Sequence, residues 1–126
     1  MRAQRYKRGR ALNKRRRKAL LKSPNDAEIK LQGILDAMFP NEWEYTGDHR
    51  FWLGNRNPDF KHRTDKKLVE LFGESWHPVT DEQDRQEHYK RYGYDCLVIW
   101  SKELFRRHPI VVKTLIRRFV ENGLQL

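Results

Sequence analysis

The sequence predicts a small α/β (α+β) domain, in which a mixed β-sheet is flanked by helices and preceded by a basic N-terminal arm. Hydrophobic residues repeat at helical spacing after residue 23, and alternating or continuously apolar segments typical of strands follow. The excess of basic residues is confined to the first 22 positions. Since 126 residues suit a single core, we expect an arm at 1–22 and one domain at 23–126.

The first helix is expected to start at Ser23 as the N-cap, with Pro24 at its first position. Its apolar residues recur at helical spacing until Phe39, where Pro40 ends the run. Glu28 lies one position away from the apolar stripe, so its carboxylate is expected at the rim of the buried face.

The later elements are expected as strands at 42–45, 51–53 and 68–72, a helix at 80–92, a strand at 95–100, and helices at 101–107 and 109–121. A further extended segment begins at Pro58. The order αβββαβαα indicates a mixed sheet, and the run at 95–100 is apolar enough to be a central buried strand. Gly93 is placed to end the helix at 80–92, and Asn122-Gly123 to end the last one. The side chains expected to face the core from these two helices are Tyr89 and Tyr92, and Val112, Leu115, Ile116 and Phe119.

The charge of the chain is concentrated in the arm. Residues 1–22 contain eleven Lys and Arg and no acid, whereas the remaining residues contain 16 basic and 17 acidic side chains. Such blocks act as interaction tails, and nucleic acid is the favoured partner because neutralising phosphates releases counterions. A solubilising tail or a contact with anionic lipid are the alternatives. The arm residues expected to contact DNA are Arg8, Arg10, Lys14, Arg15, Arg16, Arg17 and Lys18.

Other features of the sequence exclude several classes of protein. No segment approaches the roughly 18 apolar residues of a membrane span, and no apolar region follows the basic N-terminus as in a secretory signal. Cys96 is the only cysteine, which excludes a disulfide framework and a cysteine-rich zinc site. We therefore expect a protein of a reducing cytosolic compartment.

Two acidic residues are expected on neighbouring strands. Asp59 follows Pro58 at the start of one strand, and Glu70 lies inside the next between Val69 and Leu71. A carboxylate inside an apolar strand needs a partner or a metal, and two carboxylates can hold a hard cation such as Mg²⁺. Alternatively, Asp59 is only a turn residue and Glu70 pairs with Lys66 or Lys67.

A Trp-His pair follows the strand that carries Glu70. His77 would lie near the end of this strand, where a histidine can act as a metal ligand or carry a proton near neutral pH. A lone histidine is more often an ordinary surface or core residue. The combination with two acids and a basic arm makes the functional interpretation of His77 more telling.

These residues resemble a known family. The runs Asn57–Phe60, Lys67–His77 and Tyr92–Trp100 are similar to the very-short-patch-repair (Vsr-type) endonucleases of the PD-(D/E)XK superfamily, and more so to related phage and intron-associated homing endonucleases. The resemblance covers about residues 23–107 and implies a restriction-endonuclease-like core. It also implies a metal-dependent endonuclease that hydrolyses phosphodiester bonds in DNA, by nicking or by double-strand cleavage.

The resemblance assigns roles to individual residues. Asp59 would bind the metal, with Glu70 at the (D/E) position and the backbone carbonyl of Leu71 as a further ligand. His77 would transfer a proton during cleavage, and Glu28 would match the helix glutamate that the homing group places near the metals. Two further positions complete the expected site. For a fifth acid Asp81, Glu82 and Asp84 compete, and we select Asp81, while Trp76 is expected to face the DNA.

The sequence also departs from the family pattern. Phe72 replaces the lysine of the (D/E)XK triplet, so the histidine and the metal, Mg²⁺ or Mn²⁺, would have to activate water. The repair enzymes carry a structural zinc site with several cysteines, whereas Cys96 is here expected as a small buried hydrophobe, with no structural zinc. The homing or phage branch is therefore the better fit.

Two questions remain open at the level of sequence. Trp43, Tyr45, Phe51 and Trp52 could stack on bases, although aromatics of a small sheet more often form its core. The chain could also be a non-catalytic nucleic-acid-binding protein with this fold, or a junction-resolving or mismatch-nicking enzyme. A homodimer or a separate DNA-recognition partner would supply specificity that so short a chain has little surface to provide.

Overall fold

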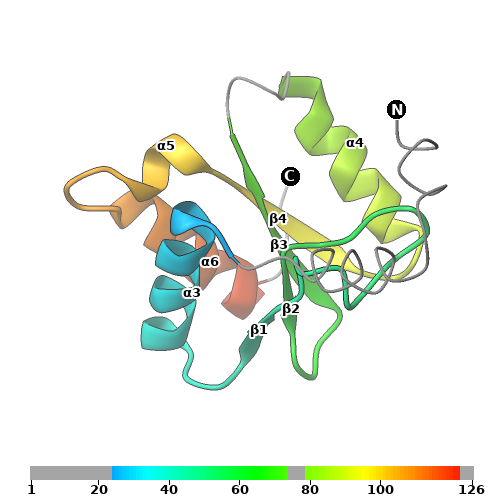
Figure 1. Ribbon diagram of the computed structural model, residues 1–126, viewed down its shortest axis with the longest axis horizontal. Coiled ribbons are helices and arrows are strands. Elements are labelled where there is room, and N and C mark those ends of the chain that lie inside the picture. Colours follow the sequence, from blue (N-terminus) through cyan, green and yellow to red (C-terminus); the bar gives the residue numbers. More distant parts are fainter. Residues whose placement is uncertain (1–23, 74–78, 123–126) are drawn as a thin grey trace, which may run out of the picture.

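The computed structural model describes residues 24–73 and 79–122, which form a four-stranded sheet with helices on both faces (Figure 1). In chain order the elements are α3 (Asp26–Met38), β1 (Trp43–Tyr45), β2 (Phe60–His62), β3 (Lys67–Phe72), α4 (Val79–Lys90), β4 (Asp95–Trp100), α5 (Ser101–Leu104) and α6 (Ile110–Asn122). This architecture confirms the predicted α+β class and the order αβββαβαα. The arm at 1–22 lies outside the described residues.

The sheet is mixed, with the strands in the order β1-β2-β3-β4. The first three strands are antiparallel, whereas β3 and β4 run parallel, from Lys67 opposite Asp95 to Phe72 opposite Trp100. Parallel neighbours require a crossover connection, which α4 provides. β4 therefore ends the strand order, and the expectation of a central strand was wrong. Its apolar run reflects burial on both faces and not the number of neighbouring strands.

Two apolar clusters hold the helices onto the sheet. On one face, Val69 and Ile99 pack with residues of α3, α5 and α6. On the other face, Leu68 and Phe72 pack with Tyr89 of α4 and with Cys96, which is fully buried as expected. Figure 1 shows this division, with α4 on the opposite side of the sheet from α3 and α6.

The start of α3 differs from the sequence prediction. The N-cap is Asn25 and not Ser23, because Asn25 and Glu28 form a reciprocal capping box. The Asn25 side chain accepts from the backbone N–H of Glu28, and the Glu28 side chain accepts from the backbone N–H of Asn25, both at 2.9 Å. The helix therefore begins later than predicted.

The segment at 51–53 is not a strand, which corrects a second prediction. Leu53 makes only an isolated bridge with Arg56, and the paired strand lies at Phe60–His62 instead. The side chain of Asn57 donates to the carbonyls of Thr46 and Phe51, both at 2.7 Å, and so holds the segment as a folded loop.

The later helices are shorter or turned relative to the prediction. α4 ends at Lys90, before Gly93 with its φ of 85°, and Tyr92 is 46 % exposed while Tyr89 is buried. α5 ends at Leu104 and not near residue 107. In α6, Leu115 is 39 % exposed because the buried stripe consists of Val112, Ile116 and Phe119.

Within residues 24–73 and 79–122, every helix is too short or too polar to cross a membrane.

The orientation of α3 can be tested with two residues of the same helix. Leu31 is fully buried, whereas Ile29 is 56 % exposed. We expect Leu31→Ala to lower the free energy of unfolding by about 2–5 kcal/mol, because it leaves a cavity in the core. Ile29→Ala should change it by less than about 0.5 kcal/mol. Urea unfolding followed by circular dichroism measures both, and equal losses would contradict this packing.

Candidate active site

Asp59 and Glu70 lie opposite each other across β2 and β3. The strands pair with Phe60 opposite Val69 and Lys61 opposite Leu68, so this register continues to Asp59 opposite Glu70. Directly opposed residues of an antiparallel pair project to the same face of the sheet. Glu70 lies two residues from both Leu68 and Phe72, so its side chain shares their face of the sheet. Leu68 and Phe72 pack toward α4, and both carboxylates therefore belong to the α4 face.

Backbone hydrogen bonds join the two carboxylates to each other's strands. The N–H of Asp59 donates to Glu70 Oε1 at 2.9 Å, and the N–H of Leu71 donates to Asp59 Oδ2 at 2.8 Å. Each acid is thereby oriented by the backbone of the facing strand, an arrangement that stabilises its charged form.

The loop after β1 fixes the backbone at Asp59. The N–H groups of Thr46 and Gly47 both donate to the carbonyl oxygen of Asp59, at 2.7 and 3.0 Å. The hydroxyl of Thr46, which is fully buried, donates to the carbonyl of Pro58 at 2.8 Å. These hydrogen bonds from the loop after β1 hold Pro58 and Asp59 in place at the start of β2.

Two side chains of α4 bind the other oxygen of Glu70. Arg85 forms an ion pair with Glu70 Oε2, and the Tyr89 hydroxyl donates to the same oxygen at 3.1 Å. Glu70 is only 1 % exposed, so these partners replace its lost hydration. The alternative pairing with Lys66 or Lys67 is wrong, since Lys67 instead donates to the carbonyl of Val120 at 3.0 Å. The sequence signal that could have identified Arg85 and Tyr89 is their four-residue spacing on one helix face.

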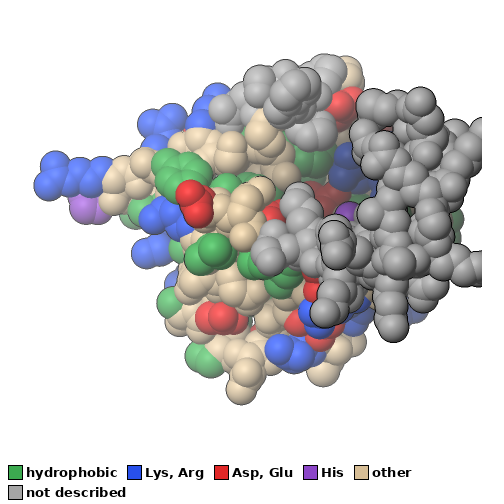
Figure 2. Space-filling model, in the orientation of Figure 1, with side chains coloured by type: hydrophobic (Ala, Val, Ile, Leu, Met, Phe, Trp, Pro, Cys, Tyr) green, Lys and Arg blue, Asp and Glu red, His purple; other side chains and the backbone are tan. Residues whose placement is uncertain are grey.

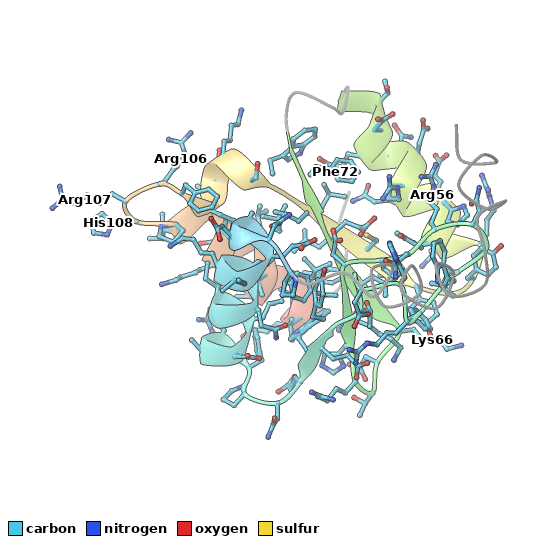
Figure 3. The ribbon with its side chains drawn as sticks, viewed as in Figure 1. Arg56, Lys66, Phe72, Arg106, Arg107 and His108 are labelled. Atoms are coloured by element: carbon cyan, nitrogen blue, oxygen red, sulfur yellow. The ribbon has the colours of Figure 1, made fainter. Side chains whose placement is uncertain are left out.

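Phe72, two residues after Glu70 in β3, packs beneath α4 (Figure 3). The guanidinium of Arg85 lies 5.1 Å from the centre of its ring. Phe72 also meets the ring of Trp100 edge-on at 5.4 Å. The aromatic ring therefore supports Arg85 in the orientation in which it reaches Glu70.

Crowding of the acids changes the proton affinity of Asp59. Burial and then the charge of Glu70 raise the pKa of Asp59 well above its usual value, and the charge of Glu28 adds to this. The hydrogen bond from the N–H of Leu71 opposes the shift without cancelling it. On the same face, burial followed by the charge of Glu70 raises the pKa of Tyr89, so its hydroxyl keeps its proton and remains a donor.

Glu28 is buried, whereas the sequence predicts it at the rim of the buried face of its helix. Only 5 % of its surface is exposed. Its Oε1 accepts from the Tyr45 hydroxyl at 3.1 Å as well as from the N–H of Asn25. Burial and the charge of Glu28 raise the pKa of Tyr45, which holds it as a donor. Glu28 thus contributes negative charge near Asp59 from the start of α3.

The three competing acids of α4 have different surroundings. Asp81 lies one turn before Arg85, on the helix face that carries Arg85 and Tyr89. Glu82 accepts a hydrogen bond from the indole N–H of Trp100 at 2.8 Å, and Asp84 is exposed. Of the three acids, Asp81 is therefore the one on the helix face that is directed toward Glu70. Its role in the site stays a prediction.

Several expected functional residues lie outside the described residues. They are Trp76, His77 and the seven arm residues expected to contact DNA, Arg8, Arg10, Lys14, Arg15, Arg16, Arg17 and Lys18.

The described acids fit a hard divalent cation by their chemistry. Within residues 24–73 and 79–122 there is no group of three or more His, Cys, Asp or Glu side chains arranged to hold a metal. Mg²⁺ in proteins, however, is usually held by one or two carboxylates together with waters and substrate phosphates. Asp59 and Glu70 supply such oxygen donors, and a cation would offset the lost hydration and the charge of Glu70 that together raise the pKa of Asp59.

Comparison with known proteins identifies the fold. No family model matches the chain, and no curated protein matches it. Among solved structures, the chain is similar to the one described as the catalytic domain of the homing endonuclease I-Bth0305I, with a TM-score of 0.61 and 21 % identity. The match covers 81 % of this chain and 100 % of that chain. The α+β fold found here is thus shared with the catalytic domain of a homing endonuclease.

The raised pKa of Asp59 predicts how stability depends on pH without metal. Unfolding returns this pKa to its ordinary value of 3.8, so above that pH the folded state binds more protons than the unfolded state. Stability therefore falls as the pH rises from that value through the raised pKa. Asp59→Asn removes this loss, so in EDTA its melting temperature should exceed that of the wild type by a margin that grows with pH.

Thermal melting of both proteins from about pH 4 to pH 8 measures this margin. Asp36→Asn, at an exposed position of α3, serves as the control and should follow the wild type. A constant or shrinking margin for Asp59→Asn would contradict the electrostatic account of the site.

Proposed function

We propose that this chain is a metal-dependent endonuclease that hydrolyses phosphodiester bonds in DNA, of the homing type found in phages and mobile elements. The observation that carries the proposal is the pair Asp59 and Glu70, which face each other across β2 and β3. The fold is shared with the catalytic domain of a homing endonuclease, which supports the same function. The resemblance of the residues quoted above supports a Vsr-like nuclease of the PD-(D/E)XK superfamily, closest to the phage and intron-associated homing endonucleases.

Asp59, Glu70 and the carbonyl of Leu71 would hold Mg²⁺ or Mn²⁺. When bound, such an ion supplies a more acidic water and stabilises negative charge on the reacting phosphate. Arg85 and Tyr89 keep Glu70 in a fixed orientation throughout. Because the pKa of Asp59 is raised, its carboxyl group holds a proton to a higher pH than usual and must lose it before it can act as a ligand. Cation binding is thereby linked to proton release.

The remaining catalytic roles fall to His77, Asp81 and Glu28. With Phe72 in place of the motif lysine, His77 is the side chain proposed to move a proton to or from a reacting oxygen. Asp81 approaches from the start of α4, and Glu28 adds negative charge from the start of α3. Trp76 is proposed to face the DNA beside His77.

DNA is the proposed partner of both parts of the chain. Basic residues of the arm, seven of its eleven Lys and Arg, would neutralise phosphates without reading sequence. The chain spans the whole length of a neighbour that is itself described as a catalytic domain. We therefore propose that target selection relies on a homodimer or a separate recognition partner.

One observation favours a second function, binding of nucleic acid without cleavage. Glu70 already forms an ion pair with Arg85 and accepts a hydrogen bond from Tyr89, so its burial is satisfied without a cation. A protein that kept this fold only for binding would need nothing more at this position. The two functions differ in whether removal of Asp59 changes any activity.

Cleavage of supercoiled plasmid with Mg²⁺, Mn²⁺ or EDTA tests the proposal. We expect nicked or linear products only with metal, and a loss of at least about 100-fold in rate for Asp59→Ala and for His77→Ala. Asp36→Ala, which removes an exposed acid of α3, should cleave as the wild type does.

The form of the product also separates the possible activities. Relaxed circles indicate nicking, and preferential cutting of branched or mismatched duplexes indicates a junction or mismatch enzyme. Salt-sensitive DNA binding with no cleavage under any metal, unchanged by Asp59→Ala, would refute the enzyme and leave the binding protein.

A further inference from the structure

The four aromatics between the start of β1 and Leu53 differ sharply in exposure. Trp43 is 1 % exposed and packs against Phe119, with ring centres 6.5 Å apart. Tyr45 and Phe51 are partly buried against the two apolar clusters. Trp52, by contrast, is 51 % exposed. Three of the four therefore form core, as aromatics of a small sheet usually do, and Trp52 is left with its large apolar surface facing solvent.

The exposed indole of Trp52 is held in one orientation. Its N–H donates to the carbonyl of His49 at 2.9 Å, and its ring stacks on the His49 imidazole with centres 5.7 Å apart. His49 has a φ of 75°, a left-handed backbone conformation unusual for a residue other than glycine. An aromatic side chain fixed in this way loses little freedom when a flat ligand stacks on it.

The loop that carries Trp52 is joined to the carboxylate site by hydrogen bonds. The amide of Asn57 donates to the carbonyl of Phe51, the residue before Trp52, at 2.7 Å. Asn57 precedes Asp59 by two residues, so at most about 7 Å of backbone separates them. Successive nucleotides of one strand of duplex DNA rise by about 3.4 Å along the helix axis. A strand that passes Asp59 therefore has its neighbouring nucleotides within reach of this loop.

The loop also lies over the same face of the sheet as the carboxylates. Phe51 packs edge-on against Tyr94, with ring centres 6.0 Å apart, and the ammonium of Lys61 lies 5.6 Å from the Phe51 ring. Lys61 follows Asp59 by two residues in β2, so the two side chains share a face. Arg56 of the same loop is exposed at the α4 side of the molecule and adds positive charge there (Figure 3).

We propose that Trp52 stacks on an unpaired or unstacked base of the DNA strand, beside the phosphate bound at Asp59. The proposal rests on the proposed function, because it takes DNA as the ligand of this face. Aromatic stacking accepts any base, since every base has a π-face. Trp52 would therefore hold the strand in register with the carboxylates without selecting a sequence.

Phe105 provides a matched control for exposure alone. It is 58 % exposed and is followed directly by two exposed arginines, Arg106 and Arg107. Figure 2 shows basic side chains projecting at the end of the molecule where Figure 3 labels Arg106 and Arg107, opposite to Arg56. If any exposed aromatic near arginine bound DNA, Phe105 would contribute as much as Trp52.

The test measures binding and cleavage separately in the full chain. Binding of a fluorescein-labelled single-stranded oligonucleotide is followed by anisotropy in EDTA, and cleavage of the supercoiled plasmid is followed with Mg²⁺. We expect Trp52→Ala to weaken binding by about 5-fold to 150-fold and Trp52→Phe to restore most of it. Phe105→Ala should bind within about twofold of the wild type, and thermal melting should show all three variants folded.

Each outcome separates this proposal from the proposed function. If the wild type cleaves and Trp52→Ala binds equally well, stacking is refuted while the nuclease stands. If nothing cleaves but Trp52→Ala binds weakly and Trp52→Phe binds well, the nuclease is refuted while stacking stands. Equal losses in Trp52→Ala and Phe105→Ala, or no binding of DNA by the wild type, would overturn the assignment of Trp52.

Discussion

A carboxylate in the interior of a strand loses its hydration, and the protein must replace every contact that water would have made. Glu70 meets this requirement with the backbone N–H of Asp59, the guanidinium of Arg85 and the hydroxyl of Tyr89. Removing one partner from a buried ion pair typically costs about 3–5 kcal/mol, so these contacts constrain both the β2–β3 register and the placement of α4. The same arrangement buries Asp59 next to a second negative charge, and burial followed by that charge raises the pKa of Asp59. The contacts that order the site therefore also leave Asp59 with a raised affinity for a proton.

The parts of the fold that the sequence predicts well are those with local signals. The apolar spacing of α3 and the continuous run of β4 report burial directly, and both elements form at or within two residues of the expected positions. The juxtaposition of Asp59 and Glu70 was also predictable, because Pro58 opens one strand and Glu70 interrupts the apolar pattern of the next. A carboxylate out of place in an apolar pattern is a local signal of a non-local contact.

The features that the sequence did not reveal depend on contacts between distant residues. The segment at 51–53 does not form the expected strand because the Asn57 side chain donates a hydrogen bond to the carbonyl of Phe51. The strand propensities of residues 51–53 carry no information about this contact with a later side chain. Glu28 is buried because Tyr45, 17 residues away, supplies a donor. Arg85 pairs with Glu70 only once α4 is packed on the sheet, although lysines nearer in sequence were available. The exposure of Trp52 was not predictable for the same reason, because it depends on how the loop folds and not on the residue type, which Trp52 shares with the buried Trp43.

The site thus combines a satisfied carboxylate, Glu70, with one that is under electrostatic strain, Asp59. In the function we propose, a divalent cation relieves this strain. Calorimetric titration of Mn²⁺ into the wild type and Asp59→Asn tests this binding, at mildly acidic pH and in buffers of different ionisation enthalpy. We expect binding to the wild type with release of a proton, and loss of that binding in Asp59→Asn. Equal binding by both proteins, or binding to the wild type without proton release, would contradict it.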